Sequence, residues 1–295
     1  IRTMIATEIG KINDPVHRFF AFARERHRIY MKRVAEVSAP WTDDPILQEY
    51  RFTNVFRELD RTTVWFRENV RDELQNEPEV LPATVIFRWF NRISTGEAIF
   101  CQGDLFDTSP FAQYLRDPIL RRANKQSPSN QVRKGGNTPL KRAILSAWGD
   151  GPYVTGAYTI NTRYAGEGLN KLDGVLMLIS QWFEAHREWF TQAQVWKQRQ
   201  PTMEEFCTWV RSNSLGPFMA YEIACDLRYS YILKDAPDWN EWANVGPGAL
   251  RGLKRIFDSV PDPLAAMRAL LSQGRRTIYW PKAFPPLDLR AIEHT

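Results

Sequence analysis

The sequence predicts an all-α protein, and three observations carry that prediction. Almost every long segment has apolar residues at helical spacing, and few segments alternate as strands do. Helix starts are also recognisable: at Asp43-Asp44-Pro45, either aspartate can cap a helix whose first position is Pro45. We therefore expect a chain built from helices and the loops between them.

The expected helices follow in order along the chain. The first, 15–37, mixes phenylalanines with arginines and lysines and indicates an amphipathic basic helix. Further helices are predicted at 45–75, 82–93, 110–123, 139–147, 171–192, 202–213, 217–233 and 247–258. The polar, basic stretch 124–138 has the composition of a linker. It divides an N-terminal helical lobe, 1–123, from a second lobe, 139–295, and the C-terminal tail can interleave the two.

Composition narrows the classes of function. The 295 residues carry 39 Lys+Arg against 34 Asp+Glu, a net charge of +5 that is compatible with a nucleic-acid partner. No apolar run is long enough to span a membrane, and the three cysteines and four histidines lack metal-ligand spacing. We expect a cytoplasmic monomer without a cofactor or metal.

Two glycine-proline turns each precede a predicted helix. In the first, Ser214-Leu215-Gly216-Pro217-Phe218, Gly216 can adopt a positive φ, and the backbone N–H groups beyond it can hold a phosphate. The second, Gly246-Pro247-Gly248, places Arg251, Lys254 and Arg255 near another helix start. Close helix packing is the alternative explanation for the glycines of this second turn. Ser214, Gly216, Phe218, Gly246, Gly248, Arg251, Lys254 and Arg255 are the predicted DNA contacts.

The first turn resembles the helix-hairpin-helix element of the DNA glycosylase superfamily, although Ser214 replaces the usual first glycine and Met219 a common threonine. The resemblance implies a catalytic aspartate about twenty residues beyond the last glycine. Asp238 is the first candidate and Asp235 the second, and each would stabilise positive charge on the sugar as a flipped base leaves. Phe218 stands where related bifunctional enzymes carry a lysine, which implies a monofunctional enzyme.

The N-terminal half offers a candidate base pocket. Asn54, Arg57, Asp60 and Arg61 are spaced to share one polar face if 45–75 is a helix, opposite the apolar face of Val55, Phe56 and Leu59. Such a face could read a base edge. A solvated, salt-bridged helix surface is the alternative.

Several segments together resemble a known family. They are Arg26–Arg33, Pro40–Pro45, Phe52–Arg61, Leu215–Leu227 and Val245–Leu253, and they are similar to the 5-hydroxymethyl-deoxyuridine DNA kinase helical domain. That family lies close to the putrescinyl and glutamyl thymine pyrophosphorylases of phage DNA hypermodification. An anti-phage glycosylase that excises glucosylated 5-hydroxymethylcytosine is also similar in size and helical organisation.

The sequence-based hypothesis is a two-lobe, monofunctional DNA glycosylase that acts in anti-phage defence. It would excise a bulky modified pyrimidine, glucosylated 5-hydroxymethylcytosine or a 5-hydroxymethyluracil derivative, from double-stranded DNA. One alternative is a hypermodification enzyme, a kinase or transferase, although the sequence lacks the Gly-x-x-x-x-Gly-Lys-Ser/Thr loop for a triphosphate. A second alternative is a non-catalytic module that binds modified DNA.

Overall fold

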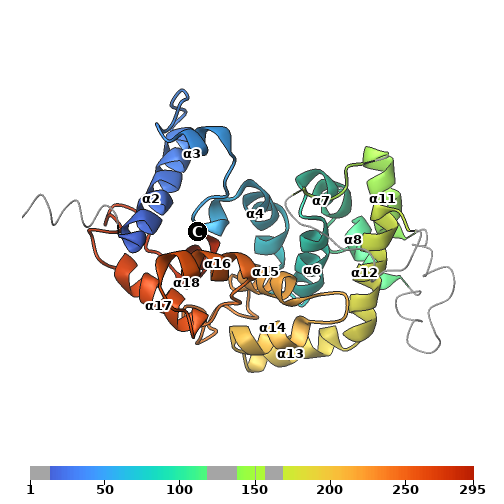
Figure 1. Ribbon diagram of the computed structural model, residues 1–295. Coiled ribbons are helices and arrows are strands. Elements are labelled where there is room, and N and C mark those ends of the chain that lie inside the picture. Colours follow the sequence, from blue (N-terminus) through green and yellow to red (C-terminus); the bar gives the residue numbers. More distant parts are fainter. Residues whose placement is uncertain (1–13, 118–137, 150, 157–168) are drawn as a thin grey trace, which may run out of the picture. The chain divides into compact units, whose positions relative to one another are not determined.

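The computed structural model describes residues 14–117, 138–149, 151–156 and 169–295, and every regular element within these ranges is a helix (Figure 1). The all-α prediction is therefore confirmed. None of the described helices is long and apolar enough to cross a membrane. The chain forms two compact units, Ile1–Asp60 with Asp238–Thr295, and Arg61–Pro237. Nearly all of the predicted linker at 124–138 lies outside the described residues, so that boundary remains a prediction.

The first unit is discontinuous in sequence. Its described helices are α2 (Pro15–Val34), α3 (Pro45–Glu49), the 3-10 helix η1 (Arg57–Leu59), α16 (Pro247–Ile256), α17 (Pro263–Gly274) and α18 (Leu289–His294). α2 packs against α16, and α18 packs against both α17 and η1. The two ends of the sequence thus build one core.

The second unit is continuous. Its described helices are α4 (Arg61–Phe66), the π-helical turn η2 (Arg67–Arg71), α5 (Asp72–Leu74), α6 (Val80–Phe90), α7 (Ile93–Phe100), α8 (Pro110–Arg116), α11 (Pro139–Trp148), α12 (Lys171–Ala185), α13 (Trp189–Gln198), α14 (Met203–Val210) and α15 (Pro217–Leu227). α6 packs against α12 and α15, and every one of its residues is buried. α6, which is buried on every side, therefore occupies the centre of this unit.

Two long predicted helices are interrupted. The segment 45–75 contains α3, η1, α4, η2 and α5, with non-helical backbone between α3 and η1. Asp44 does cap α3, because its side chain accepts from the N–H groups of Ile46 and Leu47. The predicted 171–192 helix ends at Ala185, where the His186 ring bonds to the carbonyls of Trp182 and Trp209.

Arg26 is the central polar residue of the first unit. It lies on the predicted amphipathic helix, now α2, but its side chain is buried and does not face solvent. Its Nη2 donates to Thr53 O at 2.7 Å and its Nε to the same oxygen at 3.1 Å, while Nη1 reaches Thr295 O at 3.4 Å. Burial lowers the pKa of Arg26 to about 10, and the Asp60 carboxylate opposes that shift. Arg26 therefore joins α2 to the extended segment before η1.

His27 lies beside Arg26 in an aromatic cage. Its ring centroid is 4.8 Å from that of Phe284, 5.3 Å from Phe56 and 6.0 Å from Trp280. Burial lowers the pKa of His27, because the cage disfavours the charged imidazolium. The His27 side chain therefore belongs to the core of this unit and not to its surface.

The second unit contains a buried carboxylate on α15. Asp226 has no solvent exposure. It accepts from Arg88 Nε at 2.5 Å and Nη2 at 2.8 Å, and Arg71 Nη1 lies 3.9 Å from its Oδ1. Arg88 also donates to Asn91 Oδ1 at 2.8 Å. A two-point contact of this kind fixes both the distance and the rotation of α15 against α6.

We predict that Asp226→Asn destabilises the protein by about 3–5 kcal/mol, because it leaves two buried guanidinium groups without their shared counter-charge. Urea unfolding of the variant measures this loss. Glu73→Gln is the control, since Glu73 is an exposed acidic residue of the same unit. A loss below about 1 kcal/mol, the size of an ordinary surface change, would contradict the structural role of the pair.

Candidate nucleic-acid interface

The first glycine-proline turn is a short connection between α14 and α15. Ser212 and Leu215 exchange two backbone hydrogen bonds, at 3.1 and 3.2 Å. Ser214 Oγ lies 2.9 Å from Ser212 Oγ and is largely buried, so the serine that replaces the usual glycine stabilises the turn itself. Leu215 is fully buried beneath it. The turn is thus anchored on its inner side.

Gly216 begins α15 from an exposed position. No side chain caps this helix start, and Pro217 brings no N–H. The φ of Gly216 is −81°, which any residue adopts, so the expectation of a positive φ is wrong. A Cβ at this position would also meet no described atom within 4 Å. The fold does not require glycine here, and open space lies outside the positive end of the helix.

The second glycine-proline turn, in the other unit, repeats these features. Gly246 begins α16 with φ −72°, and no side chain caps the helix. Added Cβ atoms at Gly246, Gly248 and Gly252 would meet nothing among the described residues within 4 Å. Close helix packing therefore does not explain these glycines.

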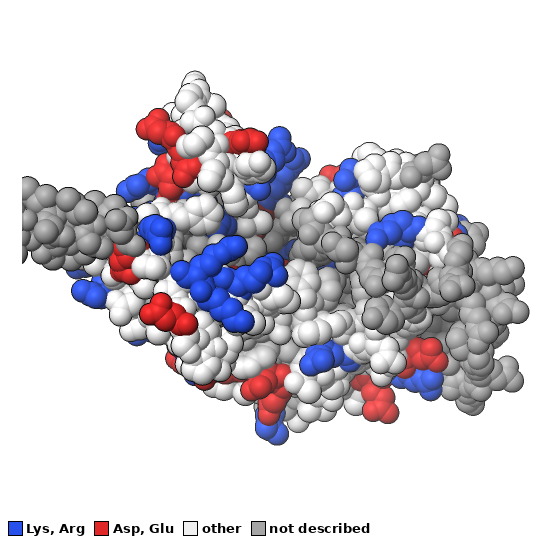
Figure 2. Space-filling model, in the orientation of Figure 1, with Lys and Arg blue, Asp and Glu red and all other residues white. Residues whose placement is uncertain are grey.

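α16 presents a basic face to solvent. Leu253 is its only buried residue, whereas Arg251, Lys254 and Arg255 are exposed and form no ion pair within the described part of the chain. Figure 2 shows basic side chains gathered over the place of α16 in Figure 1. Unpaired surface cations beside an uncapped helix start are suited to the phosphates of a nucleic-acid backbone.

The predicted base pocket does not form on one helix. Asn54 lies in the extended segment before η1, and its backbone N–H and Nδ2 donate to Asp60 Oδ1 at 2.8 and 3.1 Å. Arg57, within η1, is buried, and Arg61 is an exposed residue at the start of α4 in the other unit. The structure thus brings Asn54 and Asp60 together, where they close a loop. A role of these four residues in base recognition remains a prediction.

The two aspartates predicted to be catalytic have separate local roles. Asp235 is exposed and accepts from Gln200 Nε2 at 3.2 Å. The Asp238 carbonyl accepts from the N–H groups of Glu241 and Trp242, so this residue begins a turn rather than capping a helix at Trp239. They belong to different units.

One pocket of the second unit was not predicted from the sequence. It has a volume of about 450 Å³ and includes Phe106, Phe111, Phe183, Trp189 and Phe190 among its lining residues. The signal available in the sequence was the pair Trp189-Phe190 inside the predicted 171–192 helix. Helical spacing alone does not show that this pair follows a helix corner, between Ala185 and Trp189.

Comparison with known proteins gives the class of this chain. Residues 14–129 and 138–279 match the family described as "5-hmdU DNA kinase, helical domain". The match covers most of the sequence, and the chain belongs to this family. This family assignment agrees with the resemblance seen in its motifs.

A relative from a phage makes the comparison more specific. The chain is similar to the "5-hmdU DNA kinase" of Bacillus phage SP10, with 28% identity over 257 residues. The aligned region is 82% of this chain and 36% of the relative, so the chain spans about a third of the relative's length. No solved structure matches the chain.

These comparisons overturn the predicted reaction. The family and the phage relative are named as kinases, which are transferases, so the assignment as a DNA glycosylase is wrong. The hydrolytic roles of Asp238 and Asp235 depended on the glycosylase assignment and lose their basis. The monofunctional reaction deduced from Phe218 loses its basis for the same reason. The physical reason is that a hairpin of this type indicates contact with a phosphate backbone, and such contact is shared by enzymes of different chemistry.

We predict that Gly216→Ala leaves the free energy of unfolding within about 1 kcal/mol of the native value, because its φ and surroundings accept a methyl group. Gly96→Ala is the contrasting variant. Its Cβ would lie 2.4 Å from the Trp65 ring, so it should destabilise clearly. Thermal unfolding of both variants checks this. Equal losses at the two positions would show that Gly216 is retained for packing.

Proposed function

We propose that this chain binds DNA containing 5-hydroxymethyl-deoxyuridine and serves phosphorylation of that base. The family match over most of the chain carries the proposal. In this reaction the 5-hydroxymethyl oxygen attacks the terminal phosphorus of a nucleoside triphosphate. A phosphate ester forms, the hydroxyl proton is lost, and a nucleoside diphosphate leaves.

The helix starts supply the first part of this function, contact with the DNA backbone. α15 and α16 each begin directly after a glycine, exposed Gly216 and partly exposed Gly246, without a capping side chain and with open space for an approaching group. α16 adds Arg251, Lys254 and Arg255, which can neutralise phosphates. Such contacts hold the duplex but carry no sequence information. The modified base must be recognised elsewhere.

The triphosphate is the less defined part of the proposed reaction. The sequence contains no Walker-type phosphate loop. The matched region is also only 36% of the phage relative. We therefore propose DNA recognition as the function of this chain. Phosphoryl transfer then requires either a nucleotide site of another type here or a further kinase component.

The decisive experiment compares matched duplexes that carry 5-hydroxymethyl-deoxyuridine or thymidine at one position. Fluorescence anisotropy should give tighter binding to the modified duplex. A parallel incubation with γ-labelled ATP tests whether the chain alone transfers the label. Equal affinity for the two duplexes, with no transfer to either, would contradict the proposal.

The basic face of α16 gives a separate prediction. Arg251→Ala should weaken binding to both duplexes alike and lower the slope of log K against log salt by about 1, as expected for one lost phosphate contact. Arg268→Ala is the matched control on α17, because Arg268 is exposed but lies 3.8 Å from Glu241. Titrations at several salt concentrations measure the slope. An unchanged slope for Arg251→Ala would remove α16 from the interface.

A further inference from the structure

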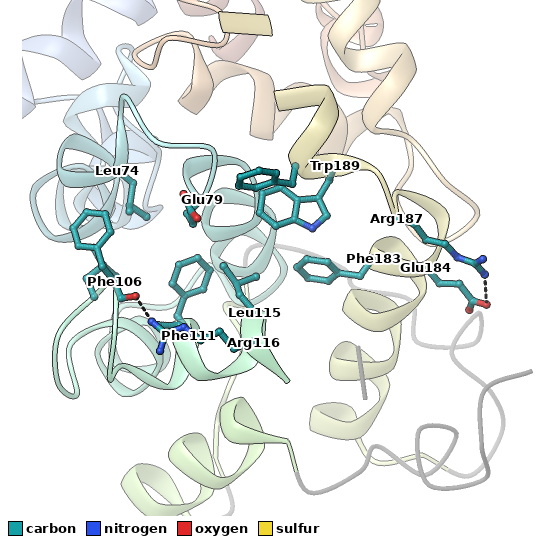
Figure 3. A pocket seen from close by; sticks show the side chains of 13 residues that line it. Leu74, Glu79, Phe106, Phe111, Leu115, Arg116, Phe183, Glu184, Arg187 and Trp189 are labelled. Carbon is teal, nitrogen blue, oxygen red and sulfur yellow. Dashed lines mark hydrogen bonds and ion pairs between the residues drawn. The ribbon is translucent and has the colours of Figure 1, made fainter. Parts of the chain in front are cut away.

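The unpredicted pocket lies entirely within Arg61–Pro237. Its walls come from α5, the 104–108 turn, α8, and the corner between α12 and α13 (Figure 3). Figure 3 shows Phe106, Phe111 and Trp189 around one opening, with the Glu79 carboxylate among them. Its volume of about 450 Å³ is in the range of small-molecule sites.

The aromatic walls are fixed in place by local contacts. Arg116 donates to Phe106 O at 2.6 Å and to Asp107 Oδ1 at 2.8 Å, which holds the turn that carries Phe106. At the other wall, the backbone N–H of Trp189 donates to His186 O at 3.0 Å. Phe106 and Phe190 nevertheless remain about half exposed, at 45% and 49%. Apolar rings that are held but not covered are suited to stacking on a flat ligand.

Glu79 is the polar group of the pocket whose side chain takes no part in the hydrogen bonds that hold the described fold. It stands at the N-cap of α6, yet its side chain makes no capping bond. The turn before the helix satisfies the first donors, since Val80 N–H donates to Glu77 O and Leu81 N–H to Pro78 O. Pro82 has no N–H. Within the described part of the chain, the Glu79 carboxylate forms no hydrogen bond or ion pair, so it can accept from a ligand.

The arginines of the pocket are already engaged. Arg116 is bound to the 106–107 turn, and Arg187 Nη2 lies 3.5 Å from Glu184 Oε1. The pocket therefore offers an available acceptor rather than an available cation. An anion is disfavoured because the Glu79 carboxylate would repel it. A purely aliphatic ligand is also disfavoured, because it would remove water from Glu79 without offering a hydrogen bond in its place. A flat ring that carries N–H donors satisfies both the walls and the carboxylate.

We infer that this pocket binds a nucleobase. The base stacks on the exposed aromatic rings, and its ring N–H or exocyclic amine donates to Glu79. Two sources present the same chemistry: the base of a nucleotide turned out of DNA, and the base of a free nucleoside triphosphate. The restriction to these two sources rests on the proposed function, whereas the nucleobase class rests on the pocket alone.

Calorimetric titration of the full chain tests the inference. The probes are 5-hydroxymethyl-2′-deoxyuridine, ATP, and the two duplexes with and without the modified base. Glu79→Gln should weaken the occupant by roughly tenfold, the effect of losing one hydrogen bond to a charged group. Phe190→Ala should weaken it several-fold. Val195→Ala is the control, because Val195 is equally exposed on α13 but does not line the pocket.

The outcomes separate the two sources. If Glu79→Gln weakens the free nucleoside and abolishes the preference for the modified duplex, the occupant is the DNA base. If it weakens ATP alone, the occupant is the phosphoryl donor. Either result supports the inference, provided that thermal unfolding shows the variant to be folded.

Other outcomes overturn it. If neither the nucleoside nor ATP binds at millimolar concentration, or if Glu79→Gln and Phe190→Ala change nothing, the pocket is not a nucleobase site. Preferential duplex binding that depends on Arg251 but not on Glu79 would leave the proposed function intact and reject the pocket. Binding of a free nucleoside without preference for the modified duplex would support the pocket and reject the proposed function.

Discussion

Asp226 is a carboxylate with no access to water, and this burial constrains the second unit around it. A lone charge there would be very costly, so Arg88 binds it at two points and Arg71 lies nearby. Apolar helix faces can slide against one another with small changes in free energy. The two-point contact of Arg88 with Asp226 forms in only one alignment of α6 and α15. Because Asp226 is on α15 and Arg88 on α6, the pair fixes the helix whose first residue is Pro217. The exposed turn at Gly216 thus begins a rigid element.

The elements that sequence reasoning located are those whose ends carry local chemistry. Pro45, Pro217 and Pro247 each begin a helix as predicted, because a proline after a suitable N-cap acts within one turn of chain. Helical spacing predicts one helix at 45–75, but the segment is divided into shorter elements. There Asn54 and Asp60 bond to one another and compete with helix formation. Spacing alone cannot show that competition.

The candidate sites were predictable to different degrees. The two glycine-proline turns were visible as motifs, although the positive φ expected at Gly216 is absent, because its backbone is ordinary and only open space lies beside it. Arg26 looked like a surface cation and is a core residue. The nucleobase pocket could not be predicted, since Glu79, Phe106 and Trp189 come from separate elements that only tertiary packing brings together.

The wrong reaction and the correct family came from the same residues. The motifs around Gly216 and Gly246 predict contact with a phosphate backbone, and proteins of many activities make that contact. The reaction depends on the groups that face the reacting atoms, and no motif in the sequence defined those groups. Family membership therefore informs the function here more than the hairpin does.

The discontinuity of the first unit has a consequence for synthesis on the ribosome. Arg24 and Arg26 of α2 donate to Tyr279 O and Thr295 O, partners more than 250 residues away in sequence. At about 5–20 residues per second, α2 leaves the ribosome roughly ten seconds to a minute before those partners exist. Phe20, fully buried in the finished protein, stays without its core during that interval. The continuous second unit can fold first, and α2 must wait, exposed to chaperones, until the segment 279–295 has been synthesised.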